Sequence, residues 1–279
     1  MATFAAEPAR LSLLLAKEAP VAIILARIRA KLFHVVKWEY AKNVVEHGSW
    51  FEGTLYPDSS DVSFDGRHMV YFTLNPRSGV FSWTAICEPP HLKAVSFQEH
   101  DSTWYGGGFF PDSKTLWLYM PKELEPGSQT RRLHSRNLQN KYRIIYPATI
   151  VTEKLPLDRR MERDGWKPVE QEGRVKVLER ASLDGRHRLR HIRDDLENPR
   201  KARYELHPAV KATSGAPVVD EVVTWADWDA EGNFFVARRG VVSRLDLDDP
   251  GHPLASLDLT HLDIPHDVKV SGESDKGEK

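Results

Sequence analysis

Large apolar residues alternate with polar ones in short runs that flank Asp-containing turns. This pattern occurs in four segments of the chain, at residues 61–72, 108–118, 181–189 and 226–236. The turns contain Asp-Gly, Pro-Asp-Ser or Glu-Gly-Asn. Asp-Gly and Glu-Gly-Asn supply the positive φ that a tight hairpin turn requires, and alternation with period two is typical of a half-buried strand. The pattern therefore predicts four β-hairpins.

The spacing of the turns predicts how the hairpins are organised. Asp65 and Asp112 are 47 residues apart, Asp112 and Asp184 are 72 apart, and Asp184 and Glu231 are again 47 apart. Propeller blades recur at roughly 40–50 residues. Two of the intervals therefore fit one blade each, and the long interval fits a blade with an insertion.

Two further features complete the predicted fold. The apolar runs at 21–25 and 32–38 indicate another hairpin before the first repeat. In the long interval, Leu157 and Met161 are four residues apart and Gly165 follows, which predicts a short helix that ends at the glycine. We expect an all-β fold, an irregular β-propeller of about five blades with a short helical insertion near 155–166. Four or six blades can be drawn from the same pattern.

Composition is that of an ordinary globular protein. The chain has 279 residues, 41% of them hydrophobic and 28% charged, with a net charge of −1. We expect a single β-propeller-like domain at 20–268, a lead segment at 1–19 with one or two helical turns, and a flexible tail at 269–279. Lys17 and Glu18 interrupt the apolar run near the start, so neither a signal peptide nor a membrane-spanning helix is expected.

The single cysteine, Cys87, cannot form a disulfide within the chain. No His, Lys or Cys adjoins it in the sequence, so we expect a buried structural thiol rather than an activated one. Nothing in the cysteine content calls for an oxidising compartment. The expected location is the cytoplasm, without a membrane partner.

Charge is divided unevenly along the chain. Residues 131–203 contain 20 Lys and Arg against 11 Asp and Glu, whereas residues 218–279 contain 6 against 14. The two stretches could attract each other across the seam of a ring. The basic stretch could also bind an acidic partner. Nucleic acid is not the expected partner, since no aromatic residues are interleaved with the arginines and no nucleic-acid-binding motif is present.

Motifs for catalysis and for cofactor binding are missing from the sequence. There is no Gly-x-x-x-x-Gly-Lys-Ser/Thr, no Gly-x-Gly-x-x-Gly, no His-Glu-x-x-His and no Gly-x-Ser-x-Gly. His187 and His191 are four apart, but in a strand that separation is about 13 Å, too far to share one metal ion. We therefore expect no metal and no cofactor. The glycines at 106–108 indicate either close approach to a ligand or a crowded inner strand, and we favour the crowded strand.

The hairpin segments resemble the repeats of a known class of propellers. The turns Asp65-Gly66-Arg67 and Asp184-Gly185-Arg186, together with the segment 225–247, look like repeats of TolB-type and WD40-like propellers. The chain is similar to uncharacterised bacterial β-propeller-like proteins of that kind. The resemblance covers about half of the chain and implies a fold, not an activity, and no catalytic residues can be carried over from it.

We expect a binding protein rather than an enzyme, one that offers the rim and axial mouth of a propeller to another protein. The alternative is a hydrolase or lyase whose axial pocket gathers His and carboxylate residues from different blades. A third possibility is an immunity or regulatory protein that binds through the basic stretch. The candidate binding residues are Arg77, His100, Asp101, Trp104 and Asp227 near the axis, and Arg186, Arg188 and Arg190 on the charged strand.

Overall fold

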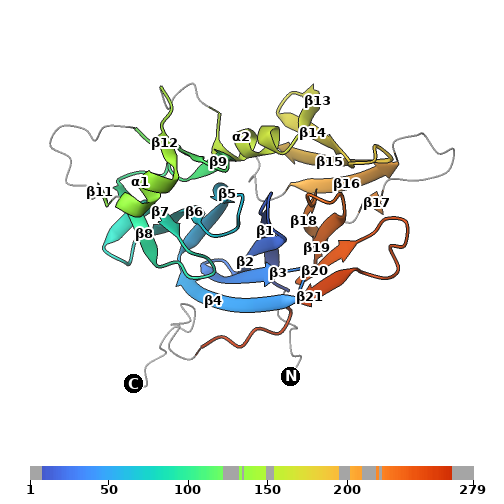
Figure 1. The fold of residues 1–279 in the computed structure, drawn as a ribbon, viewed down its shortest axis with the longest axis horizontal. Coiled ribbons are helices and arrows are strands. Elements are labelled where there is room, and N and C mark those ends of the chain that lie inside the picture. Colours follow the sequence, from blue (N-terminus) through green and yellow to red (C-terminus); the bar gives the residue numbers. More distant parts are fainter. Residues whose placement is uncertain are drawn as a thin grey trace, which may run out of the picture.

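A computed structural model describes residues 8–121, 132–133, 135–148, 154–194, 202–208, 218–219 and 222–265. These residues form five sheets and two short helices (Figure 1). We number the sheets by the order in which they first appear along the chain. Nearly all strand pairs are antiparallel, and the exception is the parallel pair of β10 with β12.

Sheet 1 is made of β1 (Arg10–Leu15), β2 (Val21–Arg29), β3 (Leu32–Glu39) and β4 (Val44–Glu52). Sheet 2 is made of β5 (Thr54–Val62), β6 (Met69–Asn75), β7 (Val80–Cys87), β8 (Ala94–His100) and β11 (Arg132–Leu133). Sheet 3 is made of β9 (Gly108–Asp112), β10 (Thr115–Leu118) and β12 (Arg143–Ile145), preceded by α1 (Arg136–Lys141).

Helix α2 (Pro156–Arg163) leads into sheet 4, made of β13 (Lys167–Glu172), β14 (Val175–Ala181), β15 (His187–Asp194), β16 (Arg203–Pro208) and β17 (Val218–Val219). Sheet 5 is made of β18 (Val223–Trp228), β19 (Phe234–Arg238), β20 (Val241–Leu245) and β21 (Ala255–Asp258).

The predicted hairpins are confirmed. The turns join β5 to β6, β9 to β10, β14 to β15 and β18 to β19, and the earlier pair is β2 with β3. The first and third turns share the sequence Ser-x-Asp-Gly-Arg-His and the same hydrogen bonds. In each turn the Ser hydroxyl donates to the Asp carboxylate and accepts from the His N–H, and the Gly has a φ of +71° or +72°. These bonds lie within six residues, so the local sequence is sufficient to form the turn.

The short helix is also confirmed. Pro156 begins α2, the position where the missing N–H of a proline costs nothing. Gly165 follows its end with a φ of +90°. The polar segment at 167–172 that follows forms β13.

The beginning of the chain differs from expectation. Helical turns were expected within residues 1–19, but residues 10–15 form β1, which pairs with β2 along its whole length. The expectation of helical turns is therefore wrong for this segment. Because residues 11 and 13–15 are buried between neighbouring elements, their run of leucines reflects a buried strand rather than the face of a helix. The tail at 269–279 lies outside the described residues.

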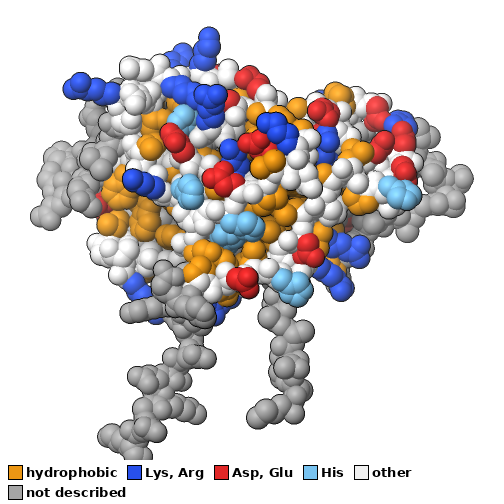
Figure 2. Space-filling model, turned by 60° about the horizontal axis from the view of Figure 1, so that its bottom comes forward, with side chains coloured by type: hydrophobic (Ala, Val, Ile, Leu, Met, Phe, Trp, Pro, Cys, Tyr) orange, Lys and Arg blue, Asp and Glu red, His pale blue; other side chains and the backbone are white. Residues whose placement is uncertain are grey.

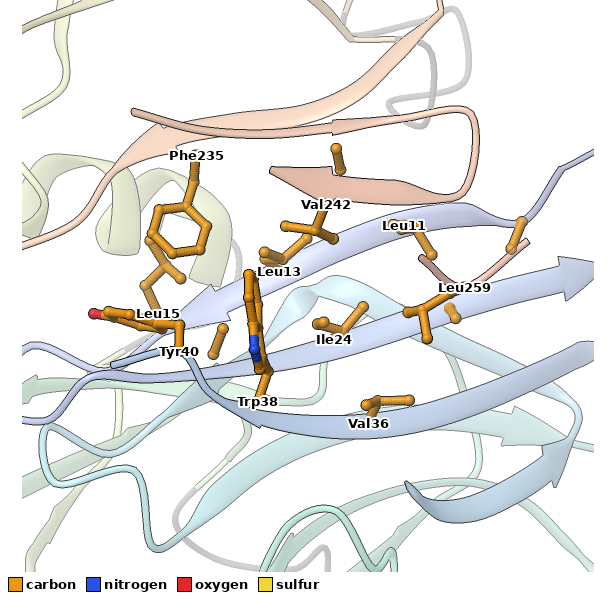
Figure 3. Packing of buried hydrophobic residues seen from close by; sticks show 14 residues of the cluster. Leu11, Leu13, Leu15, Ile24, Val36, Trp38, Tyr40, Phe235, Val242 and Leu259 are labelled. Carbon is orange, nitrogen blue, oxygen red and sulfur yellow. The ribbon is translucent and has the colours of Figure 1, made fainter. Parts of the chain in front are cut away.

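Apolar clusters join neighbouring sheets. The first cluster lies between sheets 1 and 5, where Trp38 and Leu13 of sheet 1 face Phe235 and Val242 of sheet 5 (Figure 3). A second cluster joins sheet 1 to sheet 2 and includes Cys87. Cys87 is fully buried, which confirms the structural thiol, and burial raises its pKa.

The remaining clusters continue the same arrangement. A third joins sheets 2 and 3 with α1, and a fourth joins sheets 4 and 5 with Met161 of α2 and with Trp166. Helix α2 also contacts β5 and β9. The five sheets thus lie around a centre where β1, β5, β16 and β18 approach one another (Figure 1).

Ion pairs connect the basic and acidic stretches. Arg180 of β14 pairs with Asp227 of β18, and Arg186 pairs with Asp248 through two bonds of 2.7 and 2.9 Å. The proposed attraction between the two stretches is therefore realised in part at the contact of sheets 4 and 5. On the face drawn in Figure 2, cationic and anionic side chains are interspersed rather than separated.

Candidate functional site

A cavity of about 110 Å³ lies at the centre of the fold, among sheets 1, 2, 4 and 5 and α2. Residues that are far apart in the sequence meet in it, from Arg10 in β1 to Asp227 in β18. The lining mixes charged side chains with leucines and aromatic rings. Concave sites of this kind, where polar groups from several elements converge, are the usual location of ligand sites.

One wall of the cavity is a network of buried ion pairs. Asp61 of β5 is 1% exposed and binds Arg163 of α2, and its Oδ2 also accepts the N–H of Phe110 at 2.9 Å. Arg163 donates to both oxygens of Asp164, at 2.8 and 3.1 Å, and Lys17 approaches Asp164 at 2.9 Å. The network fixes α2 to sheets 1, 2 and 3.

The environment of this network determines its protonation states. Burial by itself would raise the pKa of Asp164, but Lys17 and Arg163 hold that pKa well below the ordinary aspartate value. Burial would likewise lower the pKa of Arg163, whereas Asp61 and Asp164 raise it. Asp164 and Arg163 are therefore ionised near neutral pH. Because each is bound to a partner, the network serves to position α2 and offers no free base.

His191 has a different environment. It is 3% exposed and packs against the rings of Trp166 and Tyr204, with centroids 6.0 and 5.0 Å away. Its Nδ1 is buried, and no other described residue forms a hydrogen bond with it. Burial, together with the positive charges of Arg193 and Arg160, lowers its pKa to about 3. The imidazole is therefore neutral at physiological pH, and His191 is one of the residues that line the cavity.

Arg160 and Tyr204 lie close to this imidazole. Nη1 of Arg160 donates to the carbonyl oxygens of Pro57, at 3.1 Å, and of Ser60, which attaches the guanidinium to β5. Burial raises the pKa of Tyr204, and the nearby carboxylates of Asp58 and Asp227 raise it further. The phenol therefore keeps its proton at neutral pH. Protonated phenol, guanidinium and imidazole all line the same cavity.

Of the residues predicted from the sequence, Asp227 lines the cavity. Its Oδ1 is held by Arg180 and by the N–H of Trp228. Arg77, His100, Asp101 and Trp104 are not among the lining residues.

Those four residues lie together at one end of sheet 2. Asn75 pairs with Val80, so the turn that contains Arg77 lies at this end of the sheet. Ser82 pairs with His100, which places the end of β8 there as well. Asp101 and Trp104 follow β8 in the sequence. Trp104 is 86% exposed. His100 is buried, with Nε2 2.8 Å from Oγ1 of Thr84.

The three predicted arginines of sheet 4 form surface ion pairs. Arg188 and Arg190 lie on the face of β15 opposite to Leu189, and both donate to Glu179 at 3.1 Å. Arg186 precedes the strand and pairs with Asp184 and Asp248. Their charges are thus engaged by carboxylates of this chain.

The structure confirms that crowding, rather than approach to a ligand, accounts for the glycines at 106–108. A Cβ at Gly106 would lie 2.3 Å from the ring of Phe72, and one at Gly107 would lie 1.9 Å from the carbonyl oxygen of Ser59. Both have positive φ, +141° and +78°. The space that a side chain would need is filled by the protein itself.

The sequence interpretation did not select Asp58, Arg160 or His191. His191 was considered only as a metal ligand. A usable signal was the alternation of Leu189, His191 and Arg193 along β15, all buried on one face, because buried polar residues in a strand mark a polar interior. Nothing local marks Asp58 or Arg160, whose role depends on elements about a hundred residues apart in the sequence.

No group of three or more possible metal ligands occurs within the described parts of the chain. Neither α1 nor α2, nor any other helix among those residues, has the length and apolarity to cross a membrane.

Comparison with known proteins yields no family. No family model matches the sequence, TolB and WD40 repeats included, and no curated protein matches it. Among solved structures, one similar chain comes from a structural and mechanistic analysis of two prolyl endopeptidases, with 11% identity and a TM-score of 0.30. That match covers 91% of this chain but 43% of the other, so this chain spans less than half the length of the protein it matches. A likeness of this size carries no argument about fold or activity.

Proposed function

We propose that this protein is an irregular five-bladed β-propeller that binds a small ligand in its central cavity. The contacts between sheets and the position of the first strands support the arrangement of the five sheets in a ring. Apolar clusters connect sheet 5 to 1, 1 to 2, 2 to 3 and 4 to 5, and α2 lies between sheets 3 and 4. In sheets 1, 2, 3 and 5 the first strand faces the centre, and the blades of a propeller are likewise arranged around a central channel. Sheet 4 departs from this order, since its β16 contacts β18.

The observation that carries the binding function is the buried, unpaired Nδ1 of His191, a residue of the cavity lining. An unsatisfied buried polar atom costs about 1–3 kcal/mol, a cost that a bound ligand would remove. The cavity has a matching size, because one water takes up about 10–15 Å³ of such a space. A volume of about 110 Å³ therefore holds roughly seven to eleven non-hydrogen atoms.

A screen of small molecules by thermal denaturation tests this function. A ligand that binds only the folded state raises its stability by RT ln(1 + [L]/Kd), so at least one class of compound should raise the Tm of the wild-type protein. Ser12 lines the cavity, and Ser12→Phe should abolish the shift by filling the space. Ser243→Phe, on β20 and away from the cavity, is the matched control and should retain it. If no compound raises the Tm, or if Ser12→Phe still binds, the proposal fails.

The hydrolase or lyase alternative has one supporting observation. Asp58, Asp227 and His191 come from three different sheets and line the same cavity. However, a general base works best with a pKa near the working pH, and the pKa of His191 is lowered to about 3. The same group is well suited to donate or accept a hydrogen bond as a neutral imidazole. Binding therefore explains the site better than acid–base catalysis does.

Binding of another protein remains a second candidate, supported by Trp104. Tryptophan is enriched among the residues that contribute most to binding at the centres of protein interfaces. Phe81 is also exposed, and it is the second residue of β7, at the same end of sheet 2. Affinity purification from the native host with the wild-type protein and with Trp104→Ser is the test. A stoichiometric partner that is lost with the variant supports this function, and an unchanged set of proteins contradicts it.

A further inference from the structure

The cavity wall holds one cation that no carboxylate of the described residues neutralises. Arg160 donates hydrogen bonds through Nη1 to two backbone carbonyls, and within the described chain it forms no ion pair. Carbonyl oxygens hold the guanidinium in place without cancelling its charge. The planar guanidinium of arginine is suited to bind a carboxylate through two parallel hydrogen bonds. Arg160 is therefore positioned for an anionic group of a ligand.

The lining residues that the structure describes carry more positive than negative charges. Among the described residues of the lining, there are five cations and four carboxylates. The cations are Arg10, Lys17, Arg27, Arg160 and Arg163, and the carboxylates are Asp58, Asp61, Asp164 and Asp227. Asp61 and Asp164 are bound by Arg163 and Lys17, and Asp227 is bound by Arg180, which lies outside the lining. The described lining therefore carries an excess of positive charge, which favours an anionic group on the ligand.

His191, which also lines the cavity, supplies a second polar contact. Its positive neighbours are Arg160 and Arg193, and its aromatic neighbours are Trp166 and Tyr204. A neutral imidazole can donate one N–H to an anion, and this would satisfy the ring nitrogen that has no partner among the described residues. Guanidinium and imidazole together form a donor pair, with the protonated phenol of Tyr204 beside them.

Apolar side chains also line the cavity, beside the charged groups and the hydroxyls of Ser12 and Thr224. Leucines of β1, β2 and β5 line the cavity, together with Phe33, Met161 and the ring of Trp166. Such a surface favours a hydrocarbon body and disfavours a second strongly hydrated group. The volume limits that body to a single ring or a short branched chain.

We propose that the ligand of the central cavity is a small organic monocarboxylate with an apolar body, bound through its carboxylate by Arg160 and His191. This inference rests on the binding function proposed above. It adds the class of ligand and the residues that recognise it.

Matched pairs of acid and amide test the inference, because they share shape and differ in charge. Phenylacetate and phenylacetamide, and isovalerate and isovaleramide, are titrated into the full-length protein by isothermal calorimetry. The acid of at least one pair should bind at least tenfold more tightly than its amide. Inorganic phosphate and phenylalanine are included as a dianion and a zwitterion, and both should bind more weakly than that acid.

Variants then locate the carboxylate. Arg160→Gln should weaken binding of the acid at least tenfold and leave binding of the amide unchanged, and Arg160→Lys should restore part of the loss. Arg159→Gln, the neighbouring position on α2 outside the cavity lining, should change neither. Should Arg160→Gln fail to fold, the comparison of acid with amide on the wild-type protein still decides the question.

The outcomes separate this inference from the function on which it rests. If amides bind as tightly as acids, or if phosphate binds best, the monocarboxylate is excluded while the cavity remains a binding site. If the acids bind but Arg160→Gln does not weaken them, the assignment of Arg160 is excluded. If neither these compounds nor any from the wider screen bind, the proposed function itself has failed.

Discussion

Sheets 1 and 4 both contribute to the central cavity, but different forces hold them. Sheet 1 lies between two apolar clusters, and six consecutive residues of its β2 are buried. In sheet 4, every residue of β13 is exposed, and ion pairs of Glu179 with Arg188 and Arg190 join β14 to β15. The first sheet is stabilised mainly by removal of apolar surface from water, and the fourth depends far more on directional polar contacts.

The difference shows how the two sides of the cavity are made. Leu13, Leu25 and Phe33 of sheet 1 form apolar lining, while His191 and Tyr204 of sheet 4 provide polar lining. Burial of apolar groups contributes about 25 cal/mol per Å² and is insensitive to salt, whereas exposed ion pairs contribute about 1 kcal/mol or less and are screened. Substitutions in the two sheets should therefore differ in size and in their dependence on solution conditions.

The largest effect is expected in sheet 1. Trp38 is fully buried between sheets 1 and 5 (Figure 3), and Trp38→Ala should destabilise the protein by about 3–5 kcal/mol because a large cavity remains. Urea denaturation followed by circular dichroism measures the change. Trp104→Ala, at the 86% exposed tryptophan, is the control and should change stability by less than about 0.5 kcal/mol. Equal effects at the two positions would contradict the packing described for sheet 1.

The next effect concerns the ion pairs beside the cavity. Asp61→Asn should cost about 3 kcal/mol, because it leaves the nearly buried Arg163 without one of its two carboxylates. Glu162→Gln removes the exposed pair with Lys154 and should cost at most about 1 kcal/mol. Thermal and urea denaturation of the two variants give the comparison. A loss below 1 kcal/mol for Asp61→Asn would show that the buried network adds little to the attachment of α2.

A third prediction concerns pH, with one histidine in each sheet. Burial lowers the pKa of His34 in sheet 1 to about 4 and that of His191 in sheet 4 to about 3. In the unfolded chain both have ordinary values near 6.5, so the unfolded state takes up more protons as the pH falls below about 6.5. Their contribution is therefore present above that pH and is lost as the pH falls toward 4 and 3.

Between pH 7.5 and pH 5, this loss should be about 2 kcal/mol for His191 and no more than that for His34. The measurement is the free energy of unfolding at both pH values for the wild-type protein and for His191→Gln. The variant should lose about 2 kcal/mol less over this interval than the wild type does. An identical pH dependence would mean that His191 is not held neutral in the folded state.

The smallest effect is expected on the surface of sheet 4. Glu179 accepts from both Arg188 and Arg190 at 3.1 Å, and Glu179→Gln should cost about 0.5–1 kcal/mol in dilute buffer. In 1 M NaCl the Debye length falls to about 3 Å, so the difference between variant and wild type should shrink. Denaturation at low and high salt measures it. A larger loss, or one that does not depend on salt, would show that these pairs are more than surface contacts.

The sequence by itself determined the hairpins and the short helix. The Ser-x-Asp-Gly-Arg-His turns at 63–68 and 182–187 close through hydrogen bonds within six residues, and Gly165 ends α2 by local geometry. Such elements depend on neighbours in the sequence, so a pattern of residues is enough to predict them. Strand β1 was missed because a short leucine-rich run fits a helix as well as a buried strand.

The tertiary structure decided the composition of the cavity. Asp58, Arg160, His191 and Asp227 come from elements up to 170 residues apart in the sequence, and no local pattern brings them together. Trp104 and Arg77, whose residue types suggested a central site, lie instead at one end of sheet 2. The physical reason is that turn formation depends on bonds between near neighbours, whereas a cavity depends on how whole sheets pack, which the apolar clusters between them determine.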